Sequence, residues 1–186
     1  VQRKAVIVGG SLGGLFAGVL LREAGFDVTI AERSRQGLDG RGAGLVGQRE
    51  IFAILRAVGC EHVAQIGVVA RERITLDRAG RVIDRVAAPQ MQLSWDRMYG
   101  AFRERFPDER YQLGRTATAA VDRGDAVEVR FADGSAETAD LVVGADGVGS
   151  VVRAAVAPDT APSYAGYAAW RGLFPEAELP ATAADL

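Results

Sequence analysis

The sequence has 186 residues, and its 22 Lys and Arg against 24 Asp and Glu give a net charge of −2. This near balance excludes an electrostatic basis for binding nucleic acid or an anionic membrane surface. No apolar run approaches the length of a membrane span and no signal-peptide pattern precedes the first apolar segment, so we expect a cytoplasmic protein. A single cysteine and a single histidine leave no disulfide and no His/Cys metal site within one chain.

Residues 5–32 read as a strand, a glycine-rich turn, a helix and a second strand. The segment Ala5–Val8 is apolar and β-branched, as in a buried parallel strand, and it stops at two glycines. Apolar residues then recur at helical spacing, small residues allow close packing on a sheet, and Gly25 ends the helix. The second strand ends on Glu32. This order of elements is typical of a dinucleotide-binding fold.

The turn after the first strand has no cationic side chain, since no Lys or Arg occurs between Gly9 and Leu21. Any phosphate bound here is therefore bound by backbone N–H groups of residues 11–14, at the positive end of the helix. The usual fingerprint has glycine at the third position, where this chain has Ser11. Serine keeps the small size but not the freedom at positive φ.

Glu32 follows Gly14 by eighteen residues. This is close to the spacing at which a carboxylate at the end of the second strand accepts hydrogen bonds from a ribose diol. The same carboxylate disfavours a 2′-phosphate. Arg33 beside it leaves NADP open, but Glu32 favours an unmodified ribose, as in FAD or NAD.

The connection at 34–46 is polar and rich in glycine, too irregular for an element of its own. Its Arg41, Gly42 and Gly44 either let the backbone approach a ligand or form a merely flexible loop. A helix is predicted over 48–58, where the apolar residues share one face.

The middle of the chain is predicted to consist mainly of short strands, and its antiparallel meander is expected to be a scaffold. The predicted elements are strands at 73–77 and 82–86 joined as a hairpin, a helix at 95–106, a strand from Tyr111 past Thr116, and antiparallel strands at 127–131 and 135–140.

A second glycine-rich turn, GADGVGSVVR, follows a short buried strand at 141–143 and leads into a helix. Asp146 lies at the carboxyl end of that strand, where open α/β sheets bind ligands. Ser150 is placed to cap the turn, and Arg153 is placed to pair with Asp146 or to reach a phosphate. The structural alternatives are a helix cap for Asp146 and a solvated surface position for Arg153.

The chain resembles the N-terminal half of the FAD-dependent aromatic hydroxylases, the single-component flavoprotein monooxygenases of the para-hydroxybenzoate hydroxylase type. Three motifs carry the resemblance: GGSLGG with Glu32 and Arg33, GADGVGSVVR, and the YAGYAAWRG segment that begins at Tyr164. The second motif discriminates, because NAD dehydrogenases share only the first. Within the family, the GGS turn and the YAGYAAWRG segment are most similar to the hydroxylases of dihydroxypyridines.

The resemblance implies a set of cofactor-binding positions and, within these residues, no catalytic and no metal-binding one. The implied FAD-binding residues are Gly9, Ser11, Leu12 and Gly14 at the pyrophosphate, Glu32 and Arg33 at the ribose, Gln48 facing the cofactor, Thr116 in a strand that flanks the adenine, and Asp146 and Arg153 in the motif shared by FAD and the nicotinamide nucleotide. Where many relatives have an arginine at the start of the helix at 95–106, this chain has Trp95.

The implied fold class is α/β, with a Rossmann-like FAD-binding domain of the glutathione-reductase type that combines a parallel sheet and an antiparallel β-meander. We expect this domain at 1–160 and the beginning of a truncated substrate-binding domain at 161–186. The family's second Gly-Asp motif is missing, the chain begins with Val1, and its last residues close no visible element. We therefore expect a fragment of a longer enzyme.

The implied activity is hydroxylation of a small aromatic or N-heterocyclic substrate, such as a dihydroxypyridine, by FAD with NADH or NADPH and O₂. The expected assembly is a homodimer. Tyr164, Trp170 and Arg171 either border a domain interface or serve packing. Two alternatives stay open: an FAD oxidoreductase that does not insert oxygen, and a nucleotide-binding module without catalysis, which would bind NAD without flavin.

Overall fold

The computed structural model of the chain describes residues 2–40, 42, 44–170 and 175–178. The chain divides into two compact units. The first consists of Val1–Arg41 and Asp96–Ala165, and the second of Gly42–Trp95 and Gly166–Leu186. The first unit contains the parallel sheet, the meander and both glycine-rich turns.

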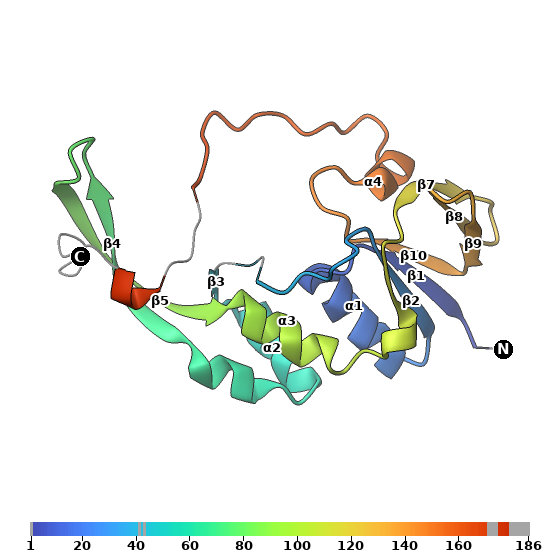
Figure 1. Cartoon of the computed structure of the whole chain (residues 1–186), viewed down its shortest axis with the longest axis horizontal. Coiled ribbons are helices and arrows are strands. Elements are labelled where there is room, and N and C mark those ends of the chain that lie inside the picture. The colour runs from blue at the N-terminus through green and yellow to red at the C-terminus, as the bar shows by residue number, and fades with distance from the viewer. Residues whose placement is uncertain (1, 41, 43, 171–174, 179–186) are drawn as a thin grey trace. The chain divides into compact units, whose positions relative to one another are not determined.

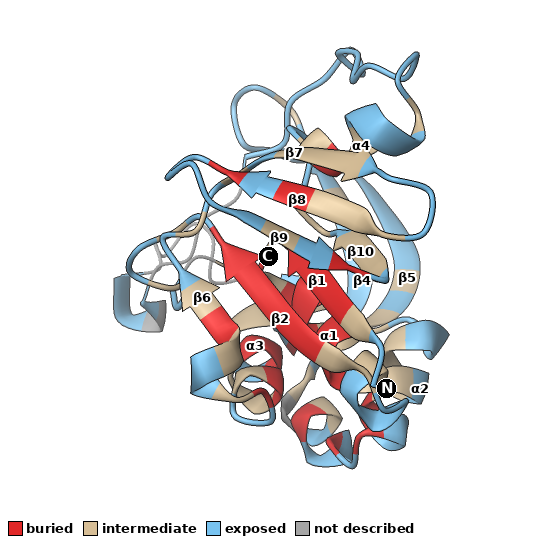
Figure 2. Cartoon of the chain, turned by 90° about the vertical axis from the view of Figure 1, so that its right-hand side faces the viewer, coloured by how far each residue is buried: buried red, intermediate tan, exposed pale blue. Residues whose placement is uncertain are grey.

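The first unit is built on a four-stranded parallel sheet with the strand order β10-β1-β2-β6; Figure 1 labels β10, β1 and β2, and Figure 2 labels β6 as well. The strands are β1 (Lys4–Val8), β2 (Asp27–Glu32), β6 (Tyr111–Leu113) and β10 (Leu141–Gly144). Ala5 is in register with Val28 on one side and with Leu141 on the other. Such a sheet is covered on both faces, and the buried positions of its central strands β1 and β2 are accordingly apolar except for Thr29 and Glu32. The predicted α/β class with a parallel sheet is confirmed.

Alternate residues of β1 face opposite sides of this sheet. Ile7 faces α1 (Leu12–Glu23), because a Cβ built on Gly14 of that helix would lie 3.4 Å from the Ile7 side chain. Helix α3 (Trp95–Arg103) packs against α1 through Phe16 and Phe102, whose ring centroids are 4.5 Å apart. Figure 2 shows α1 and α3 together on one side of β1 and β2.

The antiparallel meander covers the opposite face of the sheet. It consists of β7 (Ala117–Asp122), β8 (Val127–Phe131) and β9 (Ala136–Ala139), and α4 (Val151–Val156) packs beside it. The shared core of these elements and the sheet is formed by Val6, Val8, Ala31, Val129, Phe131, Ala139 and Val152. The predicted meander is thus confirmed, and it packs on one face of the parallel sheet.

The second unit has a three-stranded antiparallel sheet with the order β3-β5-β4. Its elements are β3 (Gly44–Val46), α2 (Arg49–Ala57), the 3₁₀ turn η1 (Glu61–Ile66), β4 (Val68–Leu76), β5 (Val82–Ser94) and η3 (Glu176–Glu178). Several large apolar side chains of β4 and β5 are exposed, including Val68, Ile83 and Val86. Within the described residues, no helix combines the length and apolar character that crossing a bilayer requires.

Some predicted element boundaries are wrong. The connection at 34–46 is not wholly irregular, because Gly44–Val46 forms β3 and pairs with the end of β5. The hairpin at 73–86 is correct in position, but its strands extend to 68 and to 94. Helix α3 ends at Arg103 rather than at 106.

The predicted strand from Tyr111 past Thr116 is two strands in two different sheets. The 3₁₀ turn η2 (Asp108–Arg110) leads into β6, and Gly114 then adopts φ +70°. This left-handed conformation turns the chain out of the parallel sheet and into β7. Thr116 consequently lies in the connection and not in a strand. Arg41 and Arg171, both singled out above, lie outside the described residues, as does most of 161–186 after Trp170.

Candidate dinucleotide site

Glycine is required at the first position of the turn between β1 and α1 and at the third residue of α1, for two different reasons. Gly9 adopts φ +102°, and a Cβ there would lie 2.3 Å from the Ala145 carbonyl O. A Cβ on Gly14 would lie 1.9 Å from the Gly9 carbonyl O. Ser11 has φ −73°, so this position needs no glycine and the departure from the fingerprint costs no backbone strain.

The start of α1 presents backbone donors. Ser11 is the N-cap residue, its side chain makes no capping hydrogen bond, and the first N–H that bonds back to it is that of Leu15, at 2.9 Å. Among the described residues, no acceptor is recorded for the N–H groups of residues 11–14. Together with the helix dipole, these donors form an environment suited to an anion.

Glu32 ends β2 directly beside this turn and is only 6% exposed. Its Oε2 accepts a hydrogen bond from the Gly10 N–H at 2.8 Å, and its Oε1 accepts one from the Ser34 N–H at 2.7 Å. Each carboxylate oxygen keeps a further lone pair that can accept a ligand hydroxyl. The carboxylate thus stabilises the turn itself, a role that the spacing argument did not include.

Tyr111 at the start of β6 is a site residue that sequence reasoning missed. Its hydroxyl donates to the Gly10 carbonyl O at 2.7 Å and lies 3.1 Å from the Tyr99 hydroxyl of α3. A Cβ on Gly10 would lie 2.3 Å from the Tyr111 hydroxyl, so the phenol fills the space beside the turn. No local pattern signals this contact, because 101 residues separate the two partners.

Burial raises the pKa of the Tyr111 phenol far above its usual value, and the hydrogen bond with Tyr99 and the nearby charge of Glu32 act in the same direction. An unfolded tyrosine ionises near pH 10. The unfolded chain therefore releases this proton at a pH where the folded chain retains it. The stability that the neutral phenol contributes is present below about pH 10 and is lost as the pH rises further.

We predict that the free energy of unfolding of the wild-type chain falls between pH 9 and pH 11.5 more steeply than that of Tyr111→Phe. The expected difference is about 1.4 kcal/mol for each pH unit above 10. Urea unfolding followed by circular dichroism at the two pH values measures it. Equal losses in both chains would show that Tyr111 ionises in the folded state.

The second glycine-rich turn lies against the first, because β10 and β1 are neighbours. The Ala145 N–H donates to the Val8 carbonyl O at 2.7 Å, and the Cβ position of Gly9 is 2.9 Å from the Asp146 N. The two motifs, more than 130 residues apart in the sequence, thus meet at one edge of the sheet. This is the carboxyl edge at which open α/β sheets bind ligands.

The side chain of Asp146 caps the start of α4, which is the structural alternative considered above. Its carboxylate accepts hydrogen bonds from the Ser150 hydroxyl, from the Val151 N–H at 2.7 Å and from the Val152 N–H at 3.4 Å. Arg153 does not pair with it, and its guanidinium donates instead to the Val148 carbonyl O at 2.9 Å. Both side chains therefore order the loop between β10 and α4, and contact of either with a nucleotide stays a prediction.

Three further predicted positions, Arg33, Gln48 and Thr116, make no hydrogen bond to the two glycine-rich turns among the described residues. Arg33 follows Glu32 and is exposed. Gln48 is the exposed N-cap residue of α2, in the second unit. Thr116 accepts a hydrogen bond at its carbonyl O from the Ala132 N–H and so joins the meander. Their cofactor contacts remain predictions.

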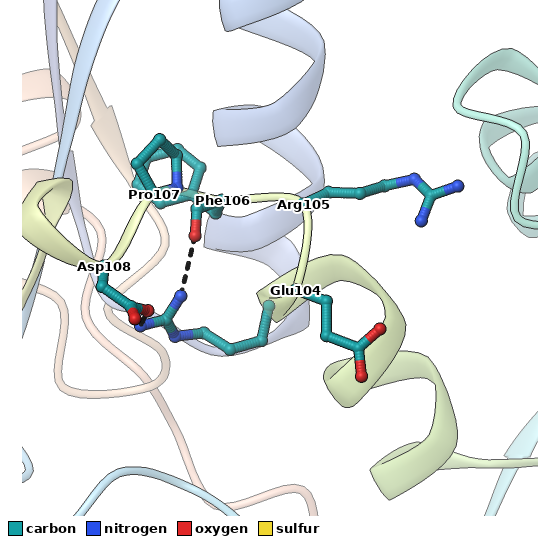
Figure 3. Close-up of a pocket in the computed structure, with 6 residues that line it drawn as sticks. Glu104, Arg105, Phe106, Pro107 and Asp108 are labelled. Atoms are coloured by element: carbon teal, nitrogen blue, oxygen red, sulfur yellow. Dashed lines mark hydrogen bonds and ion pairs between the residues drawn. The ribbon is translucent and has the colours of Figure 1, made fainter.

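Among the described residues, no group of three or more His, Cys, Asp or Glu is arranged to hold a metal ion. An open cavity of about 580 Å³ follows α3 and is lined by residues 103–108 (Figure 3). Its lining contains none of the residues that the sequence singled out as cofactor-binding.

The residues at the turn fit a dinucleotide in three respects. The N–H groups at the start of α1 suit a pyrophosphate, Gly13 leaves the backbone of the first helical turn exposed, and the lone pairs of Glu32 suit a ribose diol. A protein-family model described as an FAD binding domain matches residues 2–184.

Two known proteins of similar sequence are monooxygenases. The 2,6-dihydroxypyridine 3-monooxygenase of Paenarthrobacter nicotinovorans is 37% identical over 177 residues, which cover 95% of this chain and 44% of that protein. The 3-amino-4-hydroxybenzoate 2-monooxygenase of Streptomyces cremeus is 35% identical over 189 residues, which cover 95% of this chain and 48% of that protein.

A solved structure agrees with this result. The 2,6-dihydroxypyridine-3-hydroxylase from Arthrobacter nicotinovorans superimposes with a TM-score of 0.75 at 36% identity, covering 89% of this chain and 42% of that one. The chain spans about half the length of the curated relatives that it matches. Since the family model covers nearly every residue, the chain belongs to the FAD binding domain family.

Proposed function

We propose that this chain is the FAD-binding part of a monooxygenase that uses NADH or NADPH and O₂ to hydroxylate a small aromatic or N-heterocyclic ring. The observation that carries the proposal is that the N–H groups of residues 11–14, for which the described residues provide no acceptor, lie beside the buried carboxylate of Glu32 at the end of β2. Membership of the FAD binding domain family and the monooxygenase names of the relatives support it. They do not support the alternatives of a non-oxygenating oxidoreductase or a module without catalysis.

In this proposal the cofactor is bound through backbone more than through charge. The α1 N–H groups and dipole hold the pyrophosphate, and Glu32 accepts from the adenosine ribose. Bound FAD supplies the redox chemistry with NAD(P)H and O₂. The proposed binding residues are Gly9, Ser11, Leu12, Gly14, Glu32, Arg33, Gln48, Thr116, Asp146 and Arg153.

The substrate proposal rests on similarity. The 2,6-dihydroxypyridine 3-monooxygenase named above is 37% identical to this chain, which supports a dihydroxypyridine as substrate. We further propose an FAD-binding domain at 1–160 followed by the beginning of a substrate-binding domain at 161–186. A homodimer is the expected assembly, and the exposed apolar side chains of β4 and β5 favour self-association. A cytoplasmic location fits the need for NAD(P)H.

The cofactor assignment is tested by titrating the folded chain with FAD, following the quenching of flavin fluorescence, with NAD and NADP as competitors. Circular dichroism first establishes that the chain is folded. We expect FAD to bind with little competition from either nicotinamide nucleotide. A folded chain that prefers NAD would contradict the proposal and favour a nucleotide-binding module without flavin.

The reaction is tested in the FAD-loaded protein that carries this chain, with NADH or NADPH supplied in turn. We expect addition of 2,6-dihydroxypyridine to accelerate both nucleotide oxidation and O₂ consumption and to yield a product heavier by one oxygen atom. The matched control is pyridine, which lacks the electron-donating hydroxyls. Acceleration of nucleotide oxidation without oxygen in any product would favour an oxidoreductase that does not insert oxygen.

A further inference from the structure

Two tyrosine hydroxyls form a relay beside the turn between β1 and α1. The Gly10 carbonyl can only accept, so the single proton of the Tyr111 hydroxyl goes to it across 2.7 Å. The contact of 3.1 Å between the two hydroxyls is therefore donated by Tyr99. The relay runs from α3 through β6 to the backbone of the turn.

This relay fixes the orientation of one peptide group. In a planar trans peptide the C=O and the N–H point in opposite directions. The Gly10 carbonyl and the Ser11 N–H belong to the same peptide, so binding the carbonyl from the β6 side directs the Ser11 N–H to the opposite side. In the described part of the chain, that N–H has no recorded acceptor.

The two preceding peptide groups are held by residues of β2. The Gly10 N–H donates to Glu32 at 2.8 Å, and the Gly9 N–H donates to the Ala31 carbonyl O at 2.9 Å. Ser11 offers no side-chain cap that would order the next peptide. The hydrogen bond from the Tyr111 hydroxyl is thus the contact that fixes the next peptide group, the one that carries the Ser11 N–H.

The position of the Tyr111 ring is itself well determined. The residue is 5% exposed, the Arg103 guanidinium lies 4.4 Å from the ring centroid, and the Phe106 ring meets it edge-on at 6.5 Å. Arg103 is held in turn by the Phe106 carbonyl at 2.8 Å, the hydrogen bond drawn in Figure 3, and by Asp108. A ring packed in this way places its hydroxyl with little freedom.

We propose that Tyr111 is a positioning residue for cofactor binding: its hydroxyl orients the Gly10–Ser11 peptide so that the Ser11 N–H is presented to the pyrophosphate. The inference rests on the proposed function, because it assumes that this turn binds a dinucleotide. Tyr111 acts through the backbone and does not touch the cofactor.

The test compares the wild-type chain with Tyr111→Phe, which removes only the hydroxyl. Calorimetric titration with ADP and with FAD should show an affinity about 5-fold lower in the variant, the equivalent of one neutral hydrogen bond. In ¹⁵N-labelled chain, the Ser11 amide proton should shift downfield when ADP binds to the wild type, and this shift should be smaller in Tyr111→Phe. A purely structural role would leave the Ser11 shift at saturation unchanged.

Tyr167→Phe serves as the matched control, because Tyr167 is 74% exposed and belongs to neither relay nor turn. It should leave both affinities and the Ser11 shift unchanged. If Tyr111→Phe bound ADP and FAD as tightly as the wild-type chain does, this inference would be overturned but the proposed function would not. If the wild-type chain binds FAD and ADP but its Ser11 amide does not respond, the inference also fails, whether or not the variant folds. A folded wild-type chain that binds neither ligand would overturn the proposed function as well.

Discussion

Gly14→Ala is expected to abolish measurable FAD binding and to destabilise the chain by about 3 kcal/mol or more. The added methyl carbon would lie 1.9 Å from the Gly9 carbonyl O, well inside any van der Waals contact. That oxygen belongs to backbone directly after β1, whose last four residues are buried, so it cannot rotate away as a side chain would. Relief requires α1 to move off β1, which displaces the N–H groups at its start.

The neighbouring glycine provides a matched control for this variant. A Cβ on Gly13 has the Ala145 Cβ, at 4.0 Å, as its nearest neighbour, which is an ordinary contact. Alanine also has the higher helix propensity, by up to about 1 kcal/mol. Gly13→Ala should therefore fold with an unchanged or higher melting temperature, whereas Gly14→Ala should melt about 10 °C lower. Thermal unfolding followed by circular dichroism, and FAD fluorescence quenching, measure the two effects. Wild-type FAD affinity in Gly14→Ala would contradict the packing argument.

The parts of the site that could be predicted from the sequence are those encoded by local spacing. The strand, turn, helix and strand at 5–32 follow from apolar periodicity and from glycine positions a few residues apart. Gly14 and Glu32 belong to this unit, and the structure places both beside the turn. The meeting of the two glycine-rich turns could also be expected, because both follow short apolar strands that are neighbours in one parallel sheet, although β10 is only half-buried and not buried as predicted.

Contacts between distant segments could not be predicted in this way. Tyr111 reads as an ordinary strand residue, and only the placement of β6 next to β2 brings its hydroxyl to Gly10. The short strand β3 has three residues, too few to show alternation, and exists because β5 extends far enough to pair with it. Gly114 marks the point at which the long strand is broken. The apolar and β-branched residues on both sides of it nevertheless favour one continuous strand.

Glu32→Ala is expected to lower the free energy of unfolding by about 3 kcal/mol in the absence of any nucleotide. The substitution removes the acceptor of the Gly10 N–H, at a buried site, and that of the Ser34 N–H. Hydrogen bonds to a charged acceptor contribute about 1.5 to 3 kcal/mol each. Glu32→Gln keeps one oxygen acceptor of the same shape, so its loss should be roughly half as large.

These two variants separate the role of Glu32 in the turn from its proposed role at the ribose. Urea unfolding of the nucleotide-free chains measures the first, and FAD titration under conditions where each chain is folded measures the second. Glu23→Gln is the matched control, because Glu23 is an exposed carboxylate at the other end of α1 and its substitution should change neither quantity.

If Glu32 only orders the turn, the FAD affinity of each variant should fall in proportion to the free energy of unfolding that the variant has lost. If it also accepts from the ribose, Glu32→Gln should lose more affinity than its stability predicts, because an amide is a weaker acceptor than a carboxylate. A stable Glu32→Ala chain with wild-type FAD affinity would contradict both roles.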